Sequence, residues 1–126
     1  MSLKEKTVLV AEDDNTSRLL VKLILERNQI GCLEAKNGDE AIKILESQAC
    51  DFLLTDMQMP VLCGLGLIKA VRESEKNTNK PQLPIIILSA GVEDMTSLLE
   101  QYSINGYLTK PVFEDKLIPL LQDIER

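Results

Sequence analysis

Charged and hydroxyl side chains follow several short apolar runs of this sequence, at the point where each run ends. A lone carboxylate, for example, ends the stretch DFLLTD. The full set comprises Glu12, Asp13, Asp14, Asp56, Ser89, Thr109 and Lys110. If these runs are neighbouring parallel strands, their carboxyl ends share one edge of a sheet, which is where ligands of such sheets bind. The sequence would then gather carboxylates, hydroxyls and an ammonium group in a single site.

Carboxylates from adjacent strands repel one another unless a cation lies between them. A hard divalent ion meets that need, and a set of two or three carboxylates plus waters suits Mg²⁺ better than Ca²⁺. Lys110 adds a second positive charge, so the predicted site could hold a doubly charged oxyanion beside Asp56. A carboxylate can attack a phosphoryl group to give an acyl phosphate. Metal, lysine and hydroxyl would stabilise charge on the phosphoryl oxygens during that transfer.

Short apolar runs alternate with segments of helical period, and these elements must position the site. Strands are expected at 7–11, 31–35, 51–55, 84–90 and 104–109. Helices are expected at 15–28, 39–47, 65–75, near 93–101 and near 113–125, with a turn at 37–38 and a polar loop at 76–83. The first helix is predicted to turn Leu20, Leu23 and Ile24 inward, with Arg18, Lys22 and Glu26 on the opposite side.

This alternation predicts an α/β fold, with a doubly wound, flavodoxin-like sheet of five parallel strands and five helices on both faces. The run PIIILSA at 84–90 is apolar without alternation, as a central parallel strand is. Right-handed crossovers and the weaker second strand favour the strand order 2-1-3-4-5. Pro119 falls inside the last predicted helix, which is therefore expected to start later or to kink.

The composition indicates a single domain over residues 1–126, in which residues 1–3 have the look of a vector-derived extension. A net charge of −6 argues against direct nucleic-acid binding, which needs a basic patch. No apolar run approaches the roughly 20 residues that span a bilayer. Three cysteines without zinc-ligand spacing indicate a reducing, cytoplasmic setting. The absence of histidine excludes catalysis and metal binding by that residue within the chain.

The segments VLVAEDD, DFLLTDMQMP, IIILSA and GYLTKP resemble, in order and spacing, the receiver domain of two-component response regulators. The likeness extends from about Thr7 to Ile124. DMQMPV and the polar loop before PIIILSA are typical of receiver domains attached to hybrid histidine kinases. The resemblance implies phosphorelay signalling with Mg²⁺ as cofactor and a histidine kinase or histidine phosphotransfer protein as partner, without contact to nucleic acid or membrane. It also allows a homodimer that forms on phosphorylation.

The resemblance implies a role for each acidic residue of the site. Asp56 would be the phosphoacceptor and a metal ligand, so that the protein becomes an aspartyl phosphate. Asp13 would bind Mg²⁺ directly and Glu12 through water, while the backbone carbonyl of Gln58 would be a further metal ligand. For Asp14, capping of the first helix explains the residue nearly as well as metal binding does.

The remaining residues of the resemblance would handle the phosphoryl group and the response to it. Lys110 would pair with a phosphoryl oxygen, aimed by a cis peptide bond to Pro111. The hydroxyl of Ser89 would reach the phosphoryl group and reorient on activation, and Tyr107 would act as an aromatic switch. Many relatives have an acidic residue where Cys63 stands, although no catalytic role is lost by this difference.

Other functions stay open for the same residues. A phosphatase with an aspartyl nucleophile would need a second aspartate two residues after Asp56, where Gln58 stands. A protein-interaction module of the same fold could work without phosphorylation. A flavin site is disfavoured, because AEDDN offers acids where a phosphate-binding loop needs glycine, hydroxyl or basic groups. In the leading interpretation, the domain is not an enzyme that acts on other molecules, because it would catalyse only its own phosphorylation and dephosphorylation.

Overall fold

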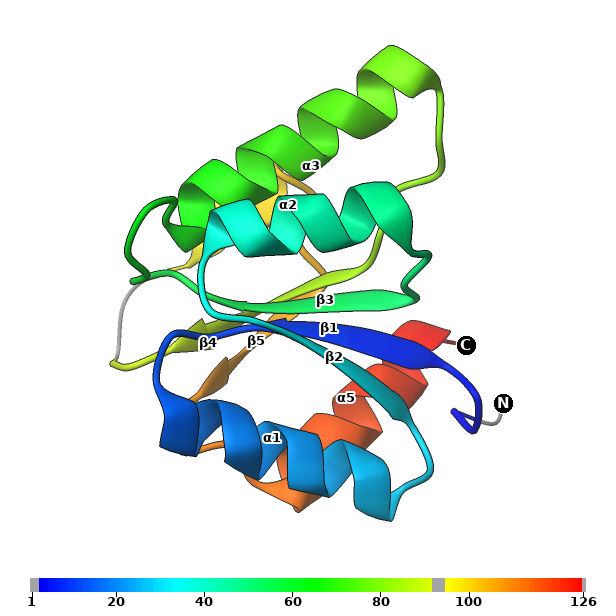
Figure 1. The fold of residues 1–126 in the computed structure, drawn as a ribbon, viewed down its shortest axis with the longest axis vertical. Helices are drawn as coiled ribbons and strands as arrows, with labels where there is room; N and C mark the ends of the chain where they lie inside the picture. The colour runs from blue at the N-terminus through cyan, green and yellow to red at the C-terminus, as the bar shows by residue number, and fades with distance from the viewer. Residues whose placement is uncertain (1–2, 92–94, 126) are drawn as a thin grey trace.

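The computed structural model describes residues 3–91 and 95–125. The described residues form one parallel sheet with the strand order β2-β1-β3-β4-β5 (Figure 1). Its strands are β1 (Thr7–Ala11), β2 (Gly31–Ala35), β3 (Phe52–Asp56), β4 (Ile85–Ser89) and β5 (Gly106–Thr109). The predicted doubly wound topology is confirmed. β1 and β2 have the predicted limits, and the limits of the other three strands differ from the predicted ones by one or two residues.

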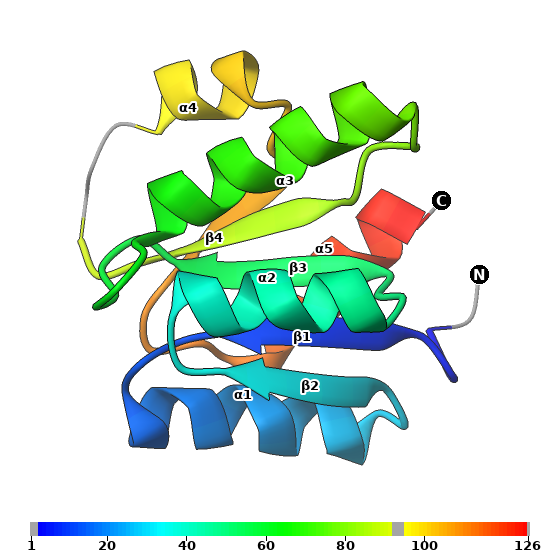
Figure 2. The same cartoon turned by 45° about the horizontal axis from the view of Figure 1, so that its top comes forward.

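Helices cover both faces of this sheet. They are α1 (Asn15–Arg27), α2 (Gly38–Ser47), α3 (Gly64–Thr78), α4 (Thr96–Gln101) and α5 (Glu114–Glu125). α1 and α5 lie on one face, while α2, α3 and α4 lie on the other (Figures 1 and 2). Residues 92–94, with which the predicted fourth helix was expected to begin, lie outside the described residues.

The central strands serve two separate cores with alternate residues. Phe52 and Leu54 of β3 pack on the α1/α5 side together with Leu25. Leu53 points the other way and packs with Leu67 of α3. All five residues of β3 and of β4 are buried, because helices cover both sides of a parallel sheet. This arrangement explains why the two strands read as apolar runs without alternation.

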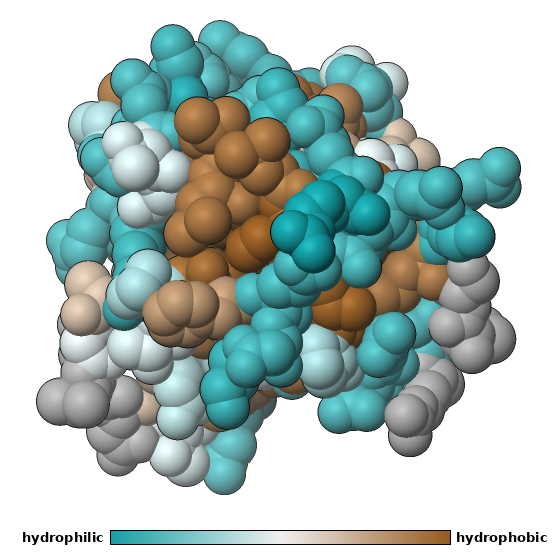
Figure 3. All heavy atoms as spheres, turned by 90° about the horizontal axis from the view of Figure 1, so that it is seen from below, coloured by the Kyte–Doolittle hydropathy of each residue, from teal (hydrophilic) through white to brown (hydrophobic). Residues whose placement is uncertain are grey.

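The rotation of α1 about its axis differs from the prediction. The helix buries Arg18, Val21, Ile24 and Leu25, whereas Leu20 and Leu23 are exposed, as is Leu19. Apolar residues occur on both sides of this helix, so hydrophobic periodicity alone could not select one rotation. The view onto the α1 and α5 side of the molecule shows a hydrophobic area on the surface (Figure 3).

Several ends of the packed segments also differ from expectation. Leu3 is buried in the α1/α5-side core, so packing begins before Thr7. Helix α3 extends to Thr78, into the predicted polar loop, and ends at Asn79 in a left-handed conformation with φ of 56°. The predicted turn at 37–38 instead starts α2: the side chain of Asn37 is the N-cap and accepts a hydrogen bond from the main chain of Glu40.

Helix α5 accommodates the proline within it. It begins at Glu114 and continues through Pro119 to Glu125, so the expected later start is wrong. Pro119 is exposed, and Leu117 and Leu121 on either side of it are fully buried. Packing of these leucines offsets the cost of the missing main-chain donor. Within residues 3–91 and 95–125, no helix is long and apolar enough to cross a membrane.

Candidate functional site

The carboxyl ends of four neighbouring strands meet at one edge of the sheet. The register places the end of β1 level with the end of β3, and the end of β4 level with the end of β5. Glu12 therefore emerges beside Asp56, and Lys110 emerges next to Ser89. The structure thus gathers at one edge the carboxylates, hydroxyl and ammonium group that the sequence places at four strand ends.

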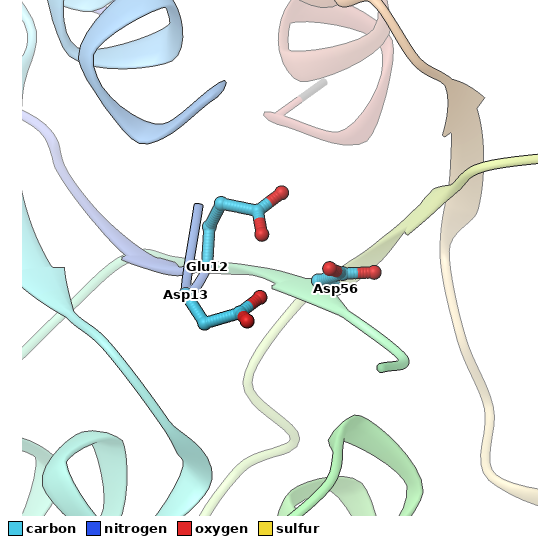
Figure 4. A group of neighbouring side chains, drawn as sticks. All are labelled: Glu12, Asp13 and Asp56. Atoms are coloured by element: carbon cyan, nitrogen blue, oxygen red, sulfur yellow. The ribbon is translucent and has the colours of Figure 1, made fainter. Parts of the chain in front are cut away.

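Three carboxylates converge at the centre of this edge. One oxygen each of Glu12, Asp13 and Asp56 lies within 4.8 Å of the others, and Figure 4 shows the three side chains around a common space. Glu12 and Asp56 are buried, with 0% and 5% of their surface exposed, while Asp13 is exposed. The cluster is therefore closed on the side of the sheet and open to solvent at Asp13.

This donor set fits Mg²⁺. Mg²⁺ prefers hard oxygen ligands and binds through one or two carboxylates while keeping several waters, and the open side at Asp13 leaves room for them. Oε1 of Glu12 is buried, and among the described residues its polar partner is the ammonium group of Lys110, with which it forms an ion pair. A buried carboxylate oxygen needs a donor or a cation, and a metal ion or a metal-bound water could share this role with Lys110.

Lys110 is the cation that lies between the buried carboxylates. Its Nζ donates a hydrogen bond to Oδ2 of Asp56 at 2.9 Å and forms an ion pair with Oε1 of Glu12. Burial alone would lower the pKa of Lys110, but the hydrogen bonds to Glu12 and Asp56 outweigh it and hold the pKa above its ordinary value. The ammonium group therefore stays charged and aimed at both carboxylates.

The surroundings of Glu12 disfavour the ionised form of its carboxyl group. Burial raises the pKa of the Glu12 carboxyl to about 7, Lys110 opposes this rise, and the nearby Asp56 carboxylate adds to it. A divalent cation placed among these groups would favour the ionised form of Glu12. The arrangement is thus better matched to a bound cation than to three free carboxylates.

The loops next to the acidic cluster hold it by main-chain contacts. Asp14 is the N-cap of α1: its Oδ2 accepts a hydrogen bond from the main chain of Ser17 at 2.8 Å. The capping role weighed for Asp14 is therefore confirmed, and Asp14 is not one of the three clustered carboxylates. On the other side, the main-chain N–H of Gln58 donates to Oδ1 of Asp56 at 3.3 Å. Both oxygens of Asp56 thus have a donor.

The predicted switch residues lie on the neighbouring strands β4 and β5, with Ser89 at the end of β4 and Tyr107 level with Ile87, before the end of β5. Ser89 is buried, and its hydroxyl donates to the main-chain oxygen of Gly91 at 2.8 Å. Tyr107 lies on the edge strand β5 and is 49% exposed. The peptide bond between Lys110 and Pro111 is cis, the isomer that the resemblance implies. The hydroxyl of Ser89 is thus engaged by its own loop, and the ring of Tyr107 is half-exposed.

Gly64 brings the start of α3 against the end of β3. A Cβ atom at this position would lie 2.1 Å from the main-chain oxygen of Asp56 and 2.7 Å from Cα of Met57. The main-chain N–H of Gly64 donates to the oxygen of Met57 at 3.1 Å. Only glycine allows this close approach of two backbones, and the contact fixes the main chain that carries Asp56.

Replacing Gly64 with alanine should therefore destabilise the protein. Because the added methyl group meets rigid backbone, we expect a loss of about 1–3 kcal/mol in the free energy of unfolding. Urea denaturation of both proteins measures the difference. Gly91→Ala is the matched control, since a Cβ there meets nothing within 4 Å, and a change within about 0.5 kcal/mol is expected. Equal losses for the two variants would contradict this account of Gly64.

Two residues that matter for the site escaped sequence reasoning. Gly64 stands after the MQMP break but carries no side chain to draw notice, and only the approach of α3 to β3 reveals its role. Arg18 was predicted to face solvent, yet it is buried against the loop that carries Glu12. No local signal separates Arg18 from the other cations of α1, Lys22 and Arg27, because only the fold shows which of them finds buried acceptors.

Comparison with known proteins agrees with this geometry. Residues 8–122 match the family model described as response regulator receiver domain. The chain is 33% identical over 119 residues to the sensor protein GacS of Pseudomonas syringae, covering 93% of this chain and only 13% of that protein. It is also 33% identical over 106 residues to the chemotaxis protein CheY of Pseudomonas aeruginosa, covering 82% of this chain and 83% of that protein.

A solved structure extends the comparison to a complex. The receiver domain of the response regulator Ssk1 of Saccharomyces cerevisiae was crystallised with the histidine phosphotransfer signalling protein Ypd1. This structure matches with a TM-score of 0.83 and 28% identity, covering 93% of this chain and 86% of the other. The matched family model spans nearly the whole sequence, and the acidic cluster lies at the strand ends where the sequence predicted it. The chain belongs to the family of response regulator receiver domains.

Proposed function

We propose that this chain is a phosphoacceptor domain of a two-component phosphorelay, in which Asp56 takes a phosphoryl group from a phosphohistidine of a partner protein. The observation that carries this proposal is the position of Asp56 itself. Its carboxylate lies within 4.8 Å of those of Glu12 and Asp13, and its Oδ2 receives a hydrogen bond from Lys110. A strand-end carboxylate that only faced solvent would not be buried with a cation and two further acids.

The chemistry follows from these groups. An oxygen of the Asp56 carboxylate attacks phosphorus, the P–N bond of the phosphohistidine breaks, and the imidazole leaves with the electron pair and takes a proton from solvent. Glu12, Asp13 and Asp56 would hold Mg²⁺, which when bound neutralises charge on the phosphoryl oxygens. Lys110 keeps its ammonium group beside the new acyl phosphate and offsets the added negative charge.

The response would begin at Ser89. Its hydroxyl, which now donates to Gly91, would turn to a phosphoryl oxygen, a stronger acceptor because it is charged. The loop after β4 would then change its contacts, and the exposed ring of Tyr107 on the neighbouring strand would follow. Such a local electrostatic change acts globally by biasing an element with two arrangements.

We further propose that the domain is not an enzyme for other substrates and works in the cytoplasm. The domain would catalyse only the formation of the acyl phosphate on Asp56 and its slow removal by water, which attacks at phosphorus. A reducing compartment suits Cys32, Cys50 and Cys63, which are all free thiols.

The experiment that tests this function is the intact mass of the protein after incubation with acetyl phosphate and Mg²⁺. We expect the wild type to gain the mass of one phosphoryl group, and Asp56→Asn to gain none. A chelator present during the reaction should prevent the gain. Labelling of Asp56→Asn would place the acceptor elsewhere. No gain in the wild type with any donor would favour the interaction module that works without phosphorylation.

We propose that the exposed surface of α1 contacts the partner protein that carries the phosphohistidine. The Ssk1 receiver domain forms a complex with a histidine phosphotransfer protein. In this chain, α1 starts next to the acidic cluster and exposes Leu19, Leu20 and Leu23. Exposed apolar patches of this kind mark protein interaction sites.

Leu23→Asp should therefore slow phosphoryl transfer from a protein donor. Leu23 is 52% exposed, so the substitution adds a charge to the contact without disturbing the core. With a phosphorylated histidine phosphotransfer protein that labels the wild type, we expect transfer to be at least about tenfold slower, since a loss of 1.4 kcal/mol in binding is tenfold. Labelling by acetyl phosphate should not change. Asn77→Asp adds the same charge to the exposed surface of α3 and should leave both rates unchanged.

A further inference from the structure

Arg18 lies in the second turn of α1 with its guanidinium turned inward. The residue is 8% exposed, and its side chain donates to three different acceptors. Nε donates to Oε1 of Glu34 at 3.1 Å, Nη1 to the main-chain oxygen of Glu12 at 2.9 Å, and Nη2 to Oδ1 of Asn15 at 2.7 Å. A planar group with donors in a fixed fork can hold three acceptors in one relative arrangement.

Two of these acceptors bracket the loop that carries two of the three clustered carboxylates, those of Glu12 and Asp13. Glu12 is the first residue after β1, and Asn15 is the first residue of α1. Arg18 thus ties both ends of this four-residue loop to one rigid group, with Asp13 between them. The main-chain N–H of Glu12 is held as well, by a hydrogen bond to the oxygen of Ala35 at 3.0 Å. The main-chain donor and acceptor of Glu12 are thus both engaged, and its carboxylate is held within the loop by the main-chain N–H of Asp14, which donates to Oε2 at 3.2 Å.

The third acceptor, Glu34, holds Arg18 in place. Glu34 lies on the edge strand β2 and also forms an ion pair with Lys22 at 3.3 Å. Burial would raise the pKa of Glu34, but the hydrogen bonds from Lys22 and Arg18 outweigh it and lower the pKa. Glu34 is therefore ionised and bonded to the guanidinium. It links β2 to the loop through Arg18, although it lies outside the acidic cluster itself.

We infer that Arg18 is a positioning residue of the metal site, which with Glu34 sets the Glu12–Asn15 loop so that Glu12 and Asp13 face Asp56. The inference rests on the metal binding that is part of the proposed function. Residues that orient metal ligands from behind change metal affinity by about 10–100-fold when they are replaced. Arg18 acts here through the main chain of a ligand residue and touches neither metal nor substrate.

Electrostatics and positioning predict opposite signs for the loss of Arg18. Removal of a positive charge near a cation site should strengthen Mg²⁺ binding, because the repulsion between the two cations is lost. Loss of the three hydrogen bonds should weaken binding, because Glu12 and Asp13 then have to be ordered by the metal itself. A merely structural role would lower the melting temperature and leave the affinity of the folded protein for Mg²⁺ unchanged or slightly tighter.

The test is a titration of ¹⁵N-labelled protein with MgCl₂, followed by the amide shifts of residues near the acidic cluster and carried out well below the melting temperature. For Arg18→Gln we expect the Kd for Mg²⁺ to rise by about 10–100-fold. Lys22→Gln is the matched control: it removes one positive charge and one partner of Glu34 but leaves the loop contacts in place. Its Kd should stay within about twofold of the wild-type value, because exposed charges are screened.

Replacements of Glu34 keep the test decisive if Arg18→Gln does not fold. Glu34→Gln retains an oxygen acceptor for Arg18 and should leave the Kd near the wild-type value, whereas Glu34→Ala should raise it. The effects of Glu34→Ala and Arg18→Gln should not add in the double variant, as they act through one network. A Kd for Arg18→Gln or Glu34→Ala that equals the wild-type value would overturn the inference.

The titration needs no phosphodonor, so it separates this inference from the proposed function. Mg²⁺ binding that depends on Arg18, in a chain that takes up no phosphoryl group, would refute the phosphoacceptor role and support the inference. Phosphorylation of Asp56 with a Kd for Mg²⁺ that does not depend on Arg18 would support the role and overturn the inference. A wild-type chain that binds no Mg²⁺ would overturn both the metal site and the inference.

Discussion

Lys110→Met should slow the phosphorylation of Asp56 by acetyl phosphate by about 100–1,000-fold at saturating Mg²⁺. That is the usual cost of removing one preorganised donor that meets developing charge in a buried site. Lys110 contacts both buried carboxylates, Asp56 through a hydrogen bond of 2.9 Å and Glu12 through an ion pair. No other described lysine or arginine forms an ion pair with either of them. Methionine keeps the length and the apolar stem but removes the charge.

The rate is measured from the fraction of phosphorylated protein by intact mass over time. Lys116→Met is the matched control, because it removes the same charge from an exposed position of α5, and its rate should equal that of the wild type. Lys110→Arg retains the charge in a larger group and is expected to fall between the two. A rate for Lys110→Met within about tenfold of the wild type would mean that the metal alone supplies the charge stabilisation.

Much of the site was predictable because it depends on strand ends, which the sequence marks clearly. In a parallel sheet the carboxyl ends share one edge, so Glu12, Asp56 and Lys110 were expected at the same edge once the strands were recognised. The run predicted as a strand at 84–90 is apolar on both faces and became β4, which is one residue shorter at each end. Local pattern and overall fold agree at these positions.

The remainder depended on tertiary contacts that no local pattern records. In the structure α1 turns Arg18 inward, where it meets three acceptors, and one of them, Glu34, lies on the edge strand β2. The end of α3 was set by the left-handed cap at Asn79 and not by the polar composition before it. Hydrophobic periodicity could not rank the two sides of α1, because leucines occur on both.

The sequence also does not reveal residues that matter because they have no side chain. Gly64 matters through the space that it leaves between β3 and α3, and a sequence shows residue types but not distances between backbones. The position of Asp56 is therefore set from two directions: by a glycine contact on the α3 side and by side-chain packing on the opposite face of the sheet. The packing side can be tested through the strand that carries Asp56.

Phe52→Ala should cost about 3–5 kcal/mol in the free energy of unfolding, the usual loss for truncating a buried phenylalanine. Phe52 is fully buried and is among the largest side chains of the α1/α5-side core. It begins β3, and because side chains alternate along a strand, Phe52, Leu54 and Asp56 share one face. The cavity would therefore lie below Asp56, in a domain whose total stability is of the order of 5–15 kcal/mol.

Urea denaturation measures this loss. The slope of the free energy of unfolding against urea concentration should be the same for the variant and the wild type, as expected if the transition remains two-state. The chain supplies its own control, because its second phenylalanine, Phe113, is 59% exposed. Phe113→Ala should change the stability by no more than about 0.5 kcal/mol. If the two losses were similar, the α1/α5-side core would not be what holds β3. If Phe52→Ala also lost acetyl phosphate labelling while still folded, the packing under β3 would be setting the position of Asp56 as well as the stability.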